Sequence, residues 1–142
     1  MKLVVDINVL VSGSLWRGNP SRLVDALLDG AATLCVSPAV LAEFEEVIQR
    51  DKFQKRIGEK GRRTHEIISR FRAAALIVEG RAIPLPFTLR DPDDVHVLSC
   101  AVDANADAII TGDNDLLSMG TFEGIPILTA RQGLEKLGIS PD

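Results

Sequence analysis

The sequence predicts an α/β fold in which helices cover both faces of a central, mostly parallel sheet of four or five strands. Short apolar runs rich in β-branched residues alternate along the chain with longer helical segments, three of which begin at an Asn-Pro, Ser-Pro or Asp-Pro pair. The runs are apolar throughout, which is typical of parallel strands buried on both faces. A length of 142 residues suits one domain, so we expect residues 1–142 to form a single unit.

The first half of the chain contains two expected strands and three expected helical segments. The apolar run after Lys2 is too short for a helix and ends at Asp6. Asn19 and Ser37 are good helix caps, and each precedes a proline that favours the first helical turn. The elements that we expect are a strand ending at Asp6, a helix over 19–30, a strand over 32–36, a helix over 37–48, and a charged helical segment over 51–72 interrupted at Gly58 and Gly61.

The second half alternates strands and helices again. Pro84 and Pro86 predict a loop over 81–90. Pro126 cannot donate to a central ladder, so we expect its strand at an edge of the sheet. The elements that we expect are a strand over 76–79, a helix over 91–104, a strand over 108–111 with a turn at 112–115, a strand over 125–128, and a closing helix over 129–137.

Composition excludes several classes of protein. Hydrophobic residues make up 46% of the chain and charged residues 25%, so the chain is not expected to be disordered. No apolar run approaches the ~20 residues of a transmembrane helix, and Asp6 interrupts any signal-peptide core. Cys35 and Cys100 lie in apolar surroundings, which suggests reduced core thiols. We therefore expect a cytoplasmic protein with no membrane partner.

Charge is unevenly distributed, although the net charge is only −4. Residues 50–72 carry nine Lys or Arg and three acids, whereas the rest of the chain carries seven Lys or Arg and seventeen acids. A basic patch on an acidic protein is the charge distribution expected of a protein that binds a polyanion next to a carboxylate-rich site. A solvated helix face is the other interpretation of such a run.

Acidic residues follow the strands at the edge where ligands bind, since ligands of parallel sheets bind beyond the carboxyl ends of the strands. Asp6 ends the first strand, and Asp113 and Asp115 follow the strand over 108–111. Taken singly, each acid is also explained as a cap or a turn residue. Three further acids open the next-to-last long helix, where the helix dipole favours them: Asp91, Asp93 and Asp94.

The helix over 37–48 adds a glutamate to this edge. Its apolar arc is centred near Phe44, with Glu43 and Glu45 at opposite edges of the arc and Glu46 pointing away. Either Glu43 or Glu45 is therefore placed to lean over the end of the sheet. Helical periodicity does not choose between them.

Such a cluster of carboxylates predicts a bound cation. At a separation of about 4 Å each pair of carboxylates costs roughly 1–4 kcal/mol. An all-oxygen set with no converging His or Cys suits a hard divalent ion, Mg²⁺ or Mn²⁺. The matching chemistry is phosphodiester hydrolysis, in which the metal activates a water and stabilises charge on the phosphate.

Four segments in this order carry a family resemblance: VVDINVLVSG, VSPAVLAEFEEVIQRDKF, RDPDDVHVLSCAVDANADAIITGDNDLL and IPILTARQGLEKL. Together they resemble PIN-domain proteins of the kind found as toxins in toxin–antitoxin modules, similar to VapC-type ribonucleases. The resemblance covers nearly the whole chain. It implies a PIN-like three-layer α/β/α sandwich.

The same resemblance implies a nuclease site that depends on Mg²⁺ or Mn²⁺. It selects Glu43 over Glu45 and assigns catalytic and metal-binding roles to four acids: Asp6, Glu43, Asp94 and Asp113. Asp115 matches a further acidic position that supports the metal, and Asn8 and Asp91 match positions around the site. One position departs from the pattern, because Ile7 stands where the family usually has Thr.

The resemblance further implies an RNA substrate, a small antitoxin protein as partner, and a homodimer. Trp16 is the aromatic residue best placed for an exposed contact, either with RNA or with a second subunit. We expect the phosphate backbone to be held by Ser12 and by five cations of the basic segment: Lys52, Lys55, Arg56, Arg62 and Arg63.

Two other functions were weighed against the nuclease. A non-catalytic RNA-binding or interaction module with the same fold would accommodate Ile7, although such a module has little reason to keep carboxylates that repel one another. A phosphatase with an aspartate nucleophile would need an Asp in place of Asn8 and a Lys ahead of the acidic turn. No Lys occurs between Lys60 and Lys136.

Overall fold

Six strands form a sheet with the order β3-β2-β1-β4-β6-β5. The computed structural model describes residues 1–83 and 91–142. The ladders from β3 through β6 are parallel, and β5 alone pairs antiparallel, with β6. The strands are β1 (Lys2–Val5), β2 (Thr33–Val36), β3 (Ala75–Ile77), β4 (Ala108–Ile110), β5 (Thr121–Phe122) and β6 (Ile125–Leu128).

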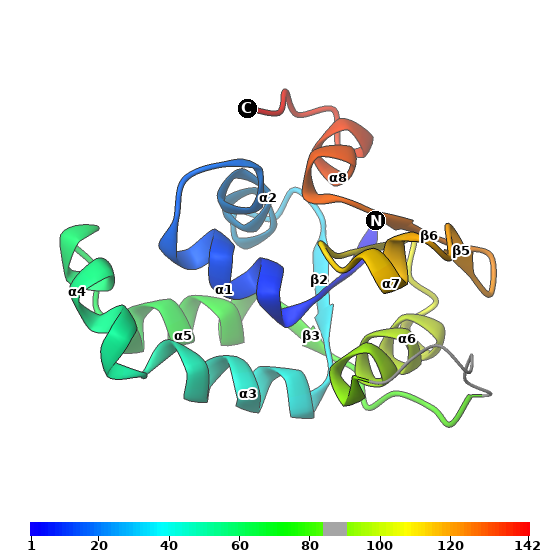
Figure 1. Cartoon of the computed structure of the whole chain (residues 1–142), viewed down its shortest axis with the longest axis horizontal. Helices are drawn as coiled ribbons and strands as arrows, with labels where there is room; N and C mark the ends of the chain where they lie inside the picture. Colours follow the sequence, from blue (N-terminus) through cyan, green and yellow to red (C-terminus); the bar gives the residue numbers. More distant parts are fainter. Residues whose placement is uncertain (84–90) are drawn as a thin grey trace.

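Helices cover both faces of this sheet and complete a three-layer α/β/α sandwich (Figure 1). Because side chains alternate along a strand, Val5 packs with α1, α2 and α8 on one face, and Val4 packs with α6 on the other. The helices are α1 (Ile7–Leu15), α2 (Asn19–Leu28), α3 (Pro38–Ile48), α4 (Asp51–Glu59), α5 (Thr64–Ala74), α6 (Pro92–Ala104), α7 (Asn114–Leu117) and α8 (Ala130–Lys136). The predicted α/β class and mostly parallel sheet are confirmed.

Side chains cap most of the helices that approach the carboxyl ends of the strands. The Ser37 hydroxyl accepts from the Val40 N–H at the start of α3, and Asp6, Asp91 and Asp113 cap α1, α6 and α7 in the same way. Asn19 was expected to cap α2, but Gly18 occupies that position and Asn19 is the first helical residue. Three of the predicted site acids thus also fix where a helix begins.

The main departure from the sequence prediction is α1, over which no helix was expected. Its sequence, INVLVSGSL, is rich in β-branched residues and nearly apolar, so its periodicity does not separate a buried face from an exposed one. Tertiary packing overrides this weak propensity, because the helix is wedged between α2 and α3. Asp6 caps it by accepting from the Asn8 N–H.

The C-terminal end of the sheet also differs from the prediction. The sheet has six strands instead of four or five, because residues 121–122 form the short β5. Consequently β6 is not the edge strand. Pro126 is tolerated there because β4 pairs with Ile127 and Leu128, one and two residues further along. Of the loop predicted over 81–90, residues 81–83 contain no helix or strand, and 84–90 lie outside the described residues.

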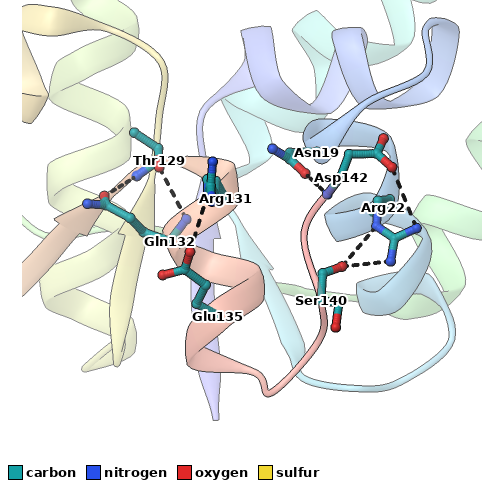
Figure 2. Close-up of polar contacts among 8 residues, drawn as sticks. All are labelled: Asn19, Arg22, Thr129, Arg131, Gln132, Glu135, Ser140 and Asp142. Atoms are coloured by element: carbon teal, nitrogen blue, oxygen red, sulfur yellow. Dashed lines mark hydrogen bonds and ion pairs between the residues drawn. The ribbon is translucent and has the colours of Figure 1, made fainter.

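The last residues of the chain are fastened to α2 (Figure 2). Arg22 donates two hydrogen bonds to the Ser140 carbonyl, at 3.1 and 2.6 Å, and the Asn19 side chain accepts from the Asp142 N–H at 2.7 Å. Beside them, Thr129 and Gln132 cap α8 reciprocally. Among the described residues, no helix is long and apolar enough to cross a membrane.

Candidate active site

Asp6 lies at the carboxyl end of the central strand β1 and is almost completely buried, with 4% of its surface exposed. One carboxylate oxygen accepts from the Asn8 N–H at 3.1 Å, and the other accepts from the Thr111 hydroxyl at 2.8 Å. Burial raises the pKa of Asp6, and these two hydrogen bonds offset part of the rise. The nearby charges of Asp113 and Asp93 add to it.

Thr111 links Asp6 to the loop that follows β4. Its side chain is fully buried, and its hydroxyl oxygen accepts from the Asp113 N–H at 3.0 Å while the hydroxyl donates to Asp6. Asp113 in turn accepts from the Asp115 N–H at 2.8 Å and caps α7. Asp115 is exposed in the first turn of that helix. The hydrogen bonds of Thr111 therefore fix the position of Asp6, which follows β1, relative to Asp113, which follows the neighbouring strand β4.

Asp94 is buried in the first turn of α6, with 3% of its surface exposed. Burial, together with the negative charges of Asp113, Asp91 and Asp6, raises its pKa to about 7. A hydrogen bond between the Asp94 and Asp113 carboxyl groups acts in the same direction, because it needs a proton on one of them. The structure therefore brings Asp6, Asp94 and Asp113 together from three separate parts of the chain.

Glu43 approaches the same helix terminus from α3. Burial raises its pKa to about 7, and a hydrogen bond and the charge of Asp93, followed by the charge of Asp91, contribute further. Asp91 itself caps α6 by accepting from the Asp93 N–H at 2.9 Å. Asp93 thus lies between Glu43 and Asp6, since its charge acts on both.

Glu45 turns to the other side of α3 and is engaged by Arg72 of α5. Arg72 donates two hydrogen bonds to the Glu45 carboxylate, and these lower the pKa of Glu45. The choice that helical periodicity left open is resolved in the structure by this ion pair. Glu43 faces the acids of α6, and Glu45 does not.

The donor set fits a hard divalent cation, although its ligands are not gathered in a closed shell. Within the described residues, no ion pair joins a Lys or Arg to Asp6, Glu43, Asp94 or Asp113. In the same part of the chain, no three His, Cys, Asp or Glu side chains converge closely enough to hold a metal without moving. Mg²⁺ commonly binds through one or two carboxylates and completes its shell with water and substrate phosphate.

A groove of about 360 Å³ opens beside Asp113 along α1. It is lined by residues of three segments: Asn8, Val9, Ser12, Pro20, Gly112 and Asp113. Asn8 is exposed and Ser12 is half-buried, so both are accessible from this groove. Ile7, by contrast, is buried in the hydrophobic core beneath α1. The residue that departs from the family pattern therefore packs inward.

The predicted phosphate-binding cations lie on and just after α4, beyond the end of α1 that is distant from Asp6 (Figure 1). Lys55 and Arg63 are exposed, Arg62 is half-buried, and the Lys52 ammonium lies 5.0 Å from the centre of the Phe53 ring. Arg56 is engaged by the protein itself, since it donates to the Leu15 carbonyl at 2.6 Å. None of these five contacts the carboxylates in the described structure.

Sequence reasoning did not single out Thr111 or assign a role in the site to Asp93. The position of Thr111 directly after a buried strand, two residues before Asp113, was the available signal. For Asp93 the only signal was its place in the run of three acids that opens α6. Both residues act through other side chains, which composition and spacing do not reveal.

Comparison with known proteins places the chain in a family. The family model described as PIN domain matches residues 2–115, a range that includes all of the acids described above. One of the matching solved structures is the crystal structure of VapBC2 from Rickettsia felis bound to a DNA fragment from their promoter. A chain of that structure matches with a TM-score of 0.57 and 14% sequence identity, over 91% of this chain and 98% of that one. No curated protein sequence matches significantly. The match over residues 2–115 shows that the chain belongs to the PIN domain family.

Proposed function

We propose that this protein is an endoribonuclease that uses Mg²⁺ or Mn²⁺ to hydrolyse RNA phosphodiesters, and that it is the toxin of a toxin–antitoxin pair. The observation that carries the proposal is that Asp6, Asp94 and Asp113 lie near enough to repel one another, with Glu43 close to the start of α6, while no described Lys or Arg forms an ion pair with any of these four acids. Mutual repulsion makes such a cluster costly unless a cation neutralises it. Membership of the PIN domain family supports the same conclusion.

Each acid has a distinct task in this proposal. Asp6 is held rigidly by Thr111 and the Asn8 N–H, so it is the fixed ligand of the cation. Asp94 of α6 and Asp113 after β4 lie near Asp6, Glu43 completes the proposed set from α3, and the Asp115 N–H supports Asp113 by donating to its carboxylate. Asn8 and Asp91 keep the starts of α1 and α6 in place around them.

The bound cation supplies positive charge that stabilises the negative charge developing on the scissile phosphate, and it favours deprotonation of the attacking water. The protein residues would hold the cation and orient the phosphate. In the metal-free protein, burial and neighbouring carboxyl groups raise the pKa of Asp94 and Glu43 to about 7, so binding of a cation near neutral pH would release protons from them. Ser12 lines the groove beside Asp113 and is placed to contact the RNA backbone.

The partners follow from the same family. The similar chain was crystallised as VapBC2 with a fragment of promoter DNA, and by analogy we propose a small antitoxin that covers the acidic groove of this protein. We further propose a homodimer. Growth arrest on expression of the protein alone, relieved by co-expression of the neighbouring short reading frame, tests the first partner, and light scattering after gel filtration tests the second.

A cleavage assay tests the nuclease itself. Labelled RNAs are incubated with the wild type, Asp6→Asn and the control Asp29→Asn, each with Mg²⁺, Mn²⁺ or EDTA. Asp29 is a suitable control because it is an exposed aspartate at the end of α2. We expect cleavage by the wild type and by Asp29→Asn in either metal, and loss of cleavage in Asp6→Asn and in EDTA.

Two other outcomes would contradict the proposal. Salt-sensitive RNA binding without cleavage in either metal would favour the non-catalytic RNA-binding module, and Ile7→Thr would then be the first variant to examine. Cleavage that persists in EDTA and in Asp6→Asn would come from another nuclease in the preparation, and the metal site would have no support.

A further inference from the structure

Trp16 is exposed at the end of α1 that is distant from the carboxylates, and its ring contacts the side chain of Arg56. Half of its surface, 50%, is exposed, which is unusual for so large an apolar side chain. The Arg56 guanidinium lies 4.9 Å from the centre of the indole ring, within the range of a cation–π contact. We call this pair, which lies at the molecular surface, the platform.

This platform is held rigidly by α4. Arg56 donates to the Leu15 carbonyl at 2.6 Å and pairs with Glu59 at 3.6 Å, and the Lys60 ammonium lies 3.2 Å from the Ser14 carbonyl. Both cations therefore contact the last carbonyls of α1, where the helix dipole favours positive charge. Because Arg56 is already fixed, a ligand that stacks on the platform loses little additional side-chain entropy to its ordering.

The surroundings of the platform are strongly positive. Burial is the first cause that lowers the pKa of Lys60, and the charges of Arg62, Arg56 and Arg17 also lower it. These four cations therefore lie near one another, and the nearby acids are Asp25 and Glu59. The phosphates of a polyanion relieve this repulsion, and the counterions condensed on the polyanion are released when these cations take their place.

α1 connects this platform to the carboxylates. Nine residues at 1.5 Å per residue give a length of about 14 Å, with Asp6 at the first end and Trp16 at the other. Asn8 and Ser12 lie between them at helical spacing, and the groove beside Asp113 follows this side of the helix. A chain of phosphates can therefore run from the carboxylates along α1 to Trp16.

We propose that Trp16 and Arg56 stack an unpaired base of the RNA, while Arg17, Lys60 and Arg62 hold the adjoining phosphates. Every base has a π-face, so the contact accepts any sequence and requires a single strand. The platform lies about 14 Å from Asp6 along α1, so a single strand bound at the carboxylates reaches it within a few nucleotides. The proposal extends the proposed nuclease by assigning it a second, remote RNA contact.

The first test uses the fact that Trp16 is the only tryptophan in the chain, so its fluorescence reports on this site alone. A single-stranded RNA of about twelve nucleotides is titrated in EDTA, which prevents metal-dependent cleavage. We expect saturable quenching that weakens with salt and in Arg62→Gln, and that is unchanged in Arg131→Gln, a control cation on α8. Duplex RNA of the same sequence and heparin, which has no bases, should quench little.

The second test separates the platform from the chemistry. A long RNA of about twelve nucleotides spans the ~14 Å from the carboxylates to the platform, whereas a short RNA with a single phosphodiester bond does not. Trp16→Ala should raise KM for the long RNA roughly tenfold, leave kcat nearly unchanged and leave the short RNA unaffected, and Trp16→Phe should restore much of the loss. Asp6→Asn should abolish cleavage of both.

The outcomes distinguish the two proposals. Absence of quenching, or an equal KM of Trp16→Ala and wild type for long RNA, overturns the platform even when cleavage proceeds normally. Quenching without cleavage supports the platform and contradicts the nuclease. Equal quenching by heparin overturns the base-stacking role and points to a site for polyanions of any kind, whereas equal quenching by an acidic peptide overturns it and points to a protein partner.

Discussion

The Thr111 hydroxyl joins the carboxylate of Asp6 to the backbone of Asp113. We therefore expect removal of this hydroxyl to weaken metal binding without abolishing it. Thr111→Val should weaken metal binding and cleavage by on the order of 10–100-fold, as is usual when a group that orients a ligand is lost. It should also lower the free energy of unfolding by about 1–3 kcal/mol, because two buried hydrogen bonds lose their partner. Calorimetric titration with Mn²⁺ and urea denaturation measure the two effects.

Thr111→Ser is the matched control, since it keeps the hydroxyl and removes only a methyl group. Metal affinity close to that of the wild type in Thr111→Ser, together with the loss in Thr111→Val, would locate the effect in the hydrogen bonds. Equal metal affinity in all three proteins would show that Thr111 does not orient Asp6.

Glu43 and Glu45 are two residues apart on α3 and have opposite surroundings, so they form a natural pair of test positions. Glu43→Gln should reduce metal-dependent cleavage by on the order of 10–100-fold, because Glu43 faces the acids of α6. Glu45→Gln should leave cleavage nearly unchanged and remove only the ion pair to Arg72. Cleavage assays on both variants test this prediction. A larger loss of cleavage in Glu45→Gln than in Glu43→Gln would contradict the proposed position of the active site.

At the scale of elements, the contact of α1 with α2 depends on the absence of a side chain at Gly13. A Cβ atom there would lie 2.5 Å from the Val24 Cγ2 and 2.6 Å from the Pro20 carbonyl oxygen. Gly13→Ala should therefore push α2 away from α1 and lower the free energy of unfolding by about 1–3 kcal/mol. Since Asp6 caps α1, the same change should weaken metal binding.

Gly58→Ala should have the opposite effect on the free energy of unfolding. Gly58 lies within α4, and a Cβ atom there would meet no other atom within 4 Å. The substitution should raise the free energy of unfolding by about 0.5–1 kcal/mol through the higher helix propensity of alanine. Urea denaturation of Gly13→Ala and Gly58→Ala tests both expectations. Similar urea midpoints of unfolding for the two variants would show that α1 and α2 are not in close contact.

The strands and most helix starts could be predicted because their signals are local. Apolar runs such as AII in β4 and caps such as Ser37 and Asp91 depend on residues only a few positions apart. α1 could not be predicted in this way, since its helical state depends on packing between α2 and α3. The short β5 exists only because a tight turn returns it to β6.

The candidate site, like the fold, could be predicted only where the signals are local. Strand ends placed Asp6 and Asp113 at one edge, and the acidic helix start placed Asp94 near them. Periodicity left Glu43 and Glu45 equivalent, because what separates them is Arg72, 27 residues away from Glu45. Thr111 and Asp93 act through contacts that appear only when distant segments meet.

For the whole molecule, the carboxylates predict an unusual dependence of stability on pH. The pKa values of Asp94 and Glu43 are raised to about 7 from their ordinary 3.8 and 4.5, so the folded protein binds more protons than the unfolded chain between these limits. The metal-free protein should therefore lose stability as the pH rises from about 4.5 to 7 and change little above. Melting temperatures in EDTA across this range provide the measurement.

Mg²⁺ should reverse this loss, and more strongly at pH 8 than at pH 5, because protons compete with the cation for the same oxygens. Asp94→Asn should flatten the pH profile, whereas the exposed control Asp29→Asn should keep it. A profile in EDTA that rises with pH would contradict the burial of these acids.

The hydrogen bond between Thr111 and Asp6 joins residues that are 105 positions apart in the sequence. This separation has a consequence while the protein is being translated. Such long-range parallel pairing forms late, since a long loop must close before any contact stabilises it. A chain on the ribosome therefore exposes Asp6, Glu43 and Asp94 well before β4 can complete the sheet. A product truncated after Ala104 would carry three of the four acids and no assembled site, so a cell making this protein would meet the proposed nuclease activity only after nearly all of the chain had been translated.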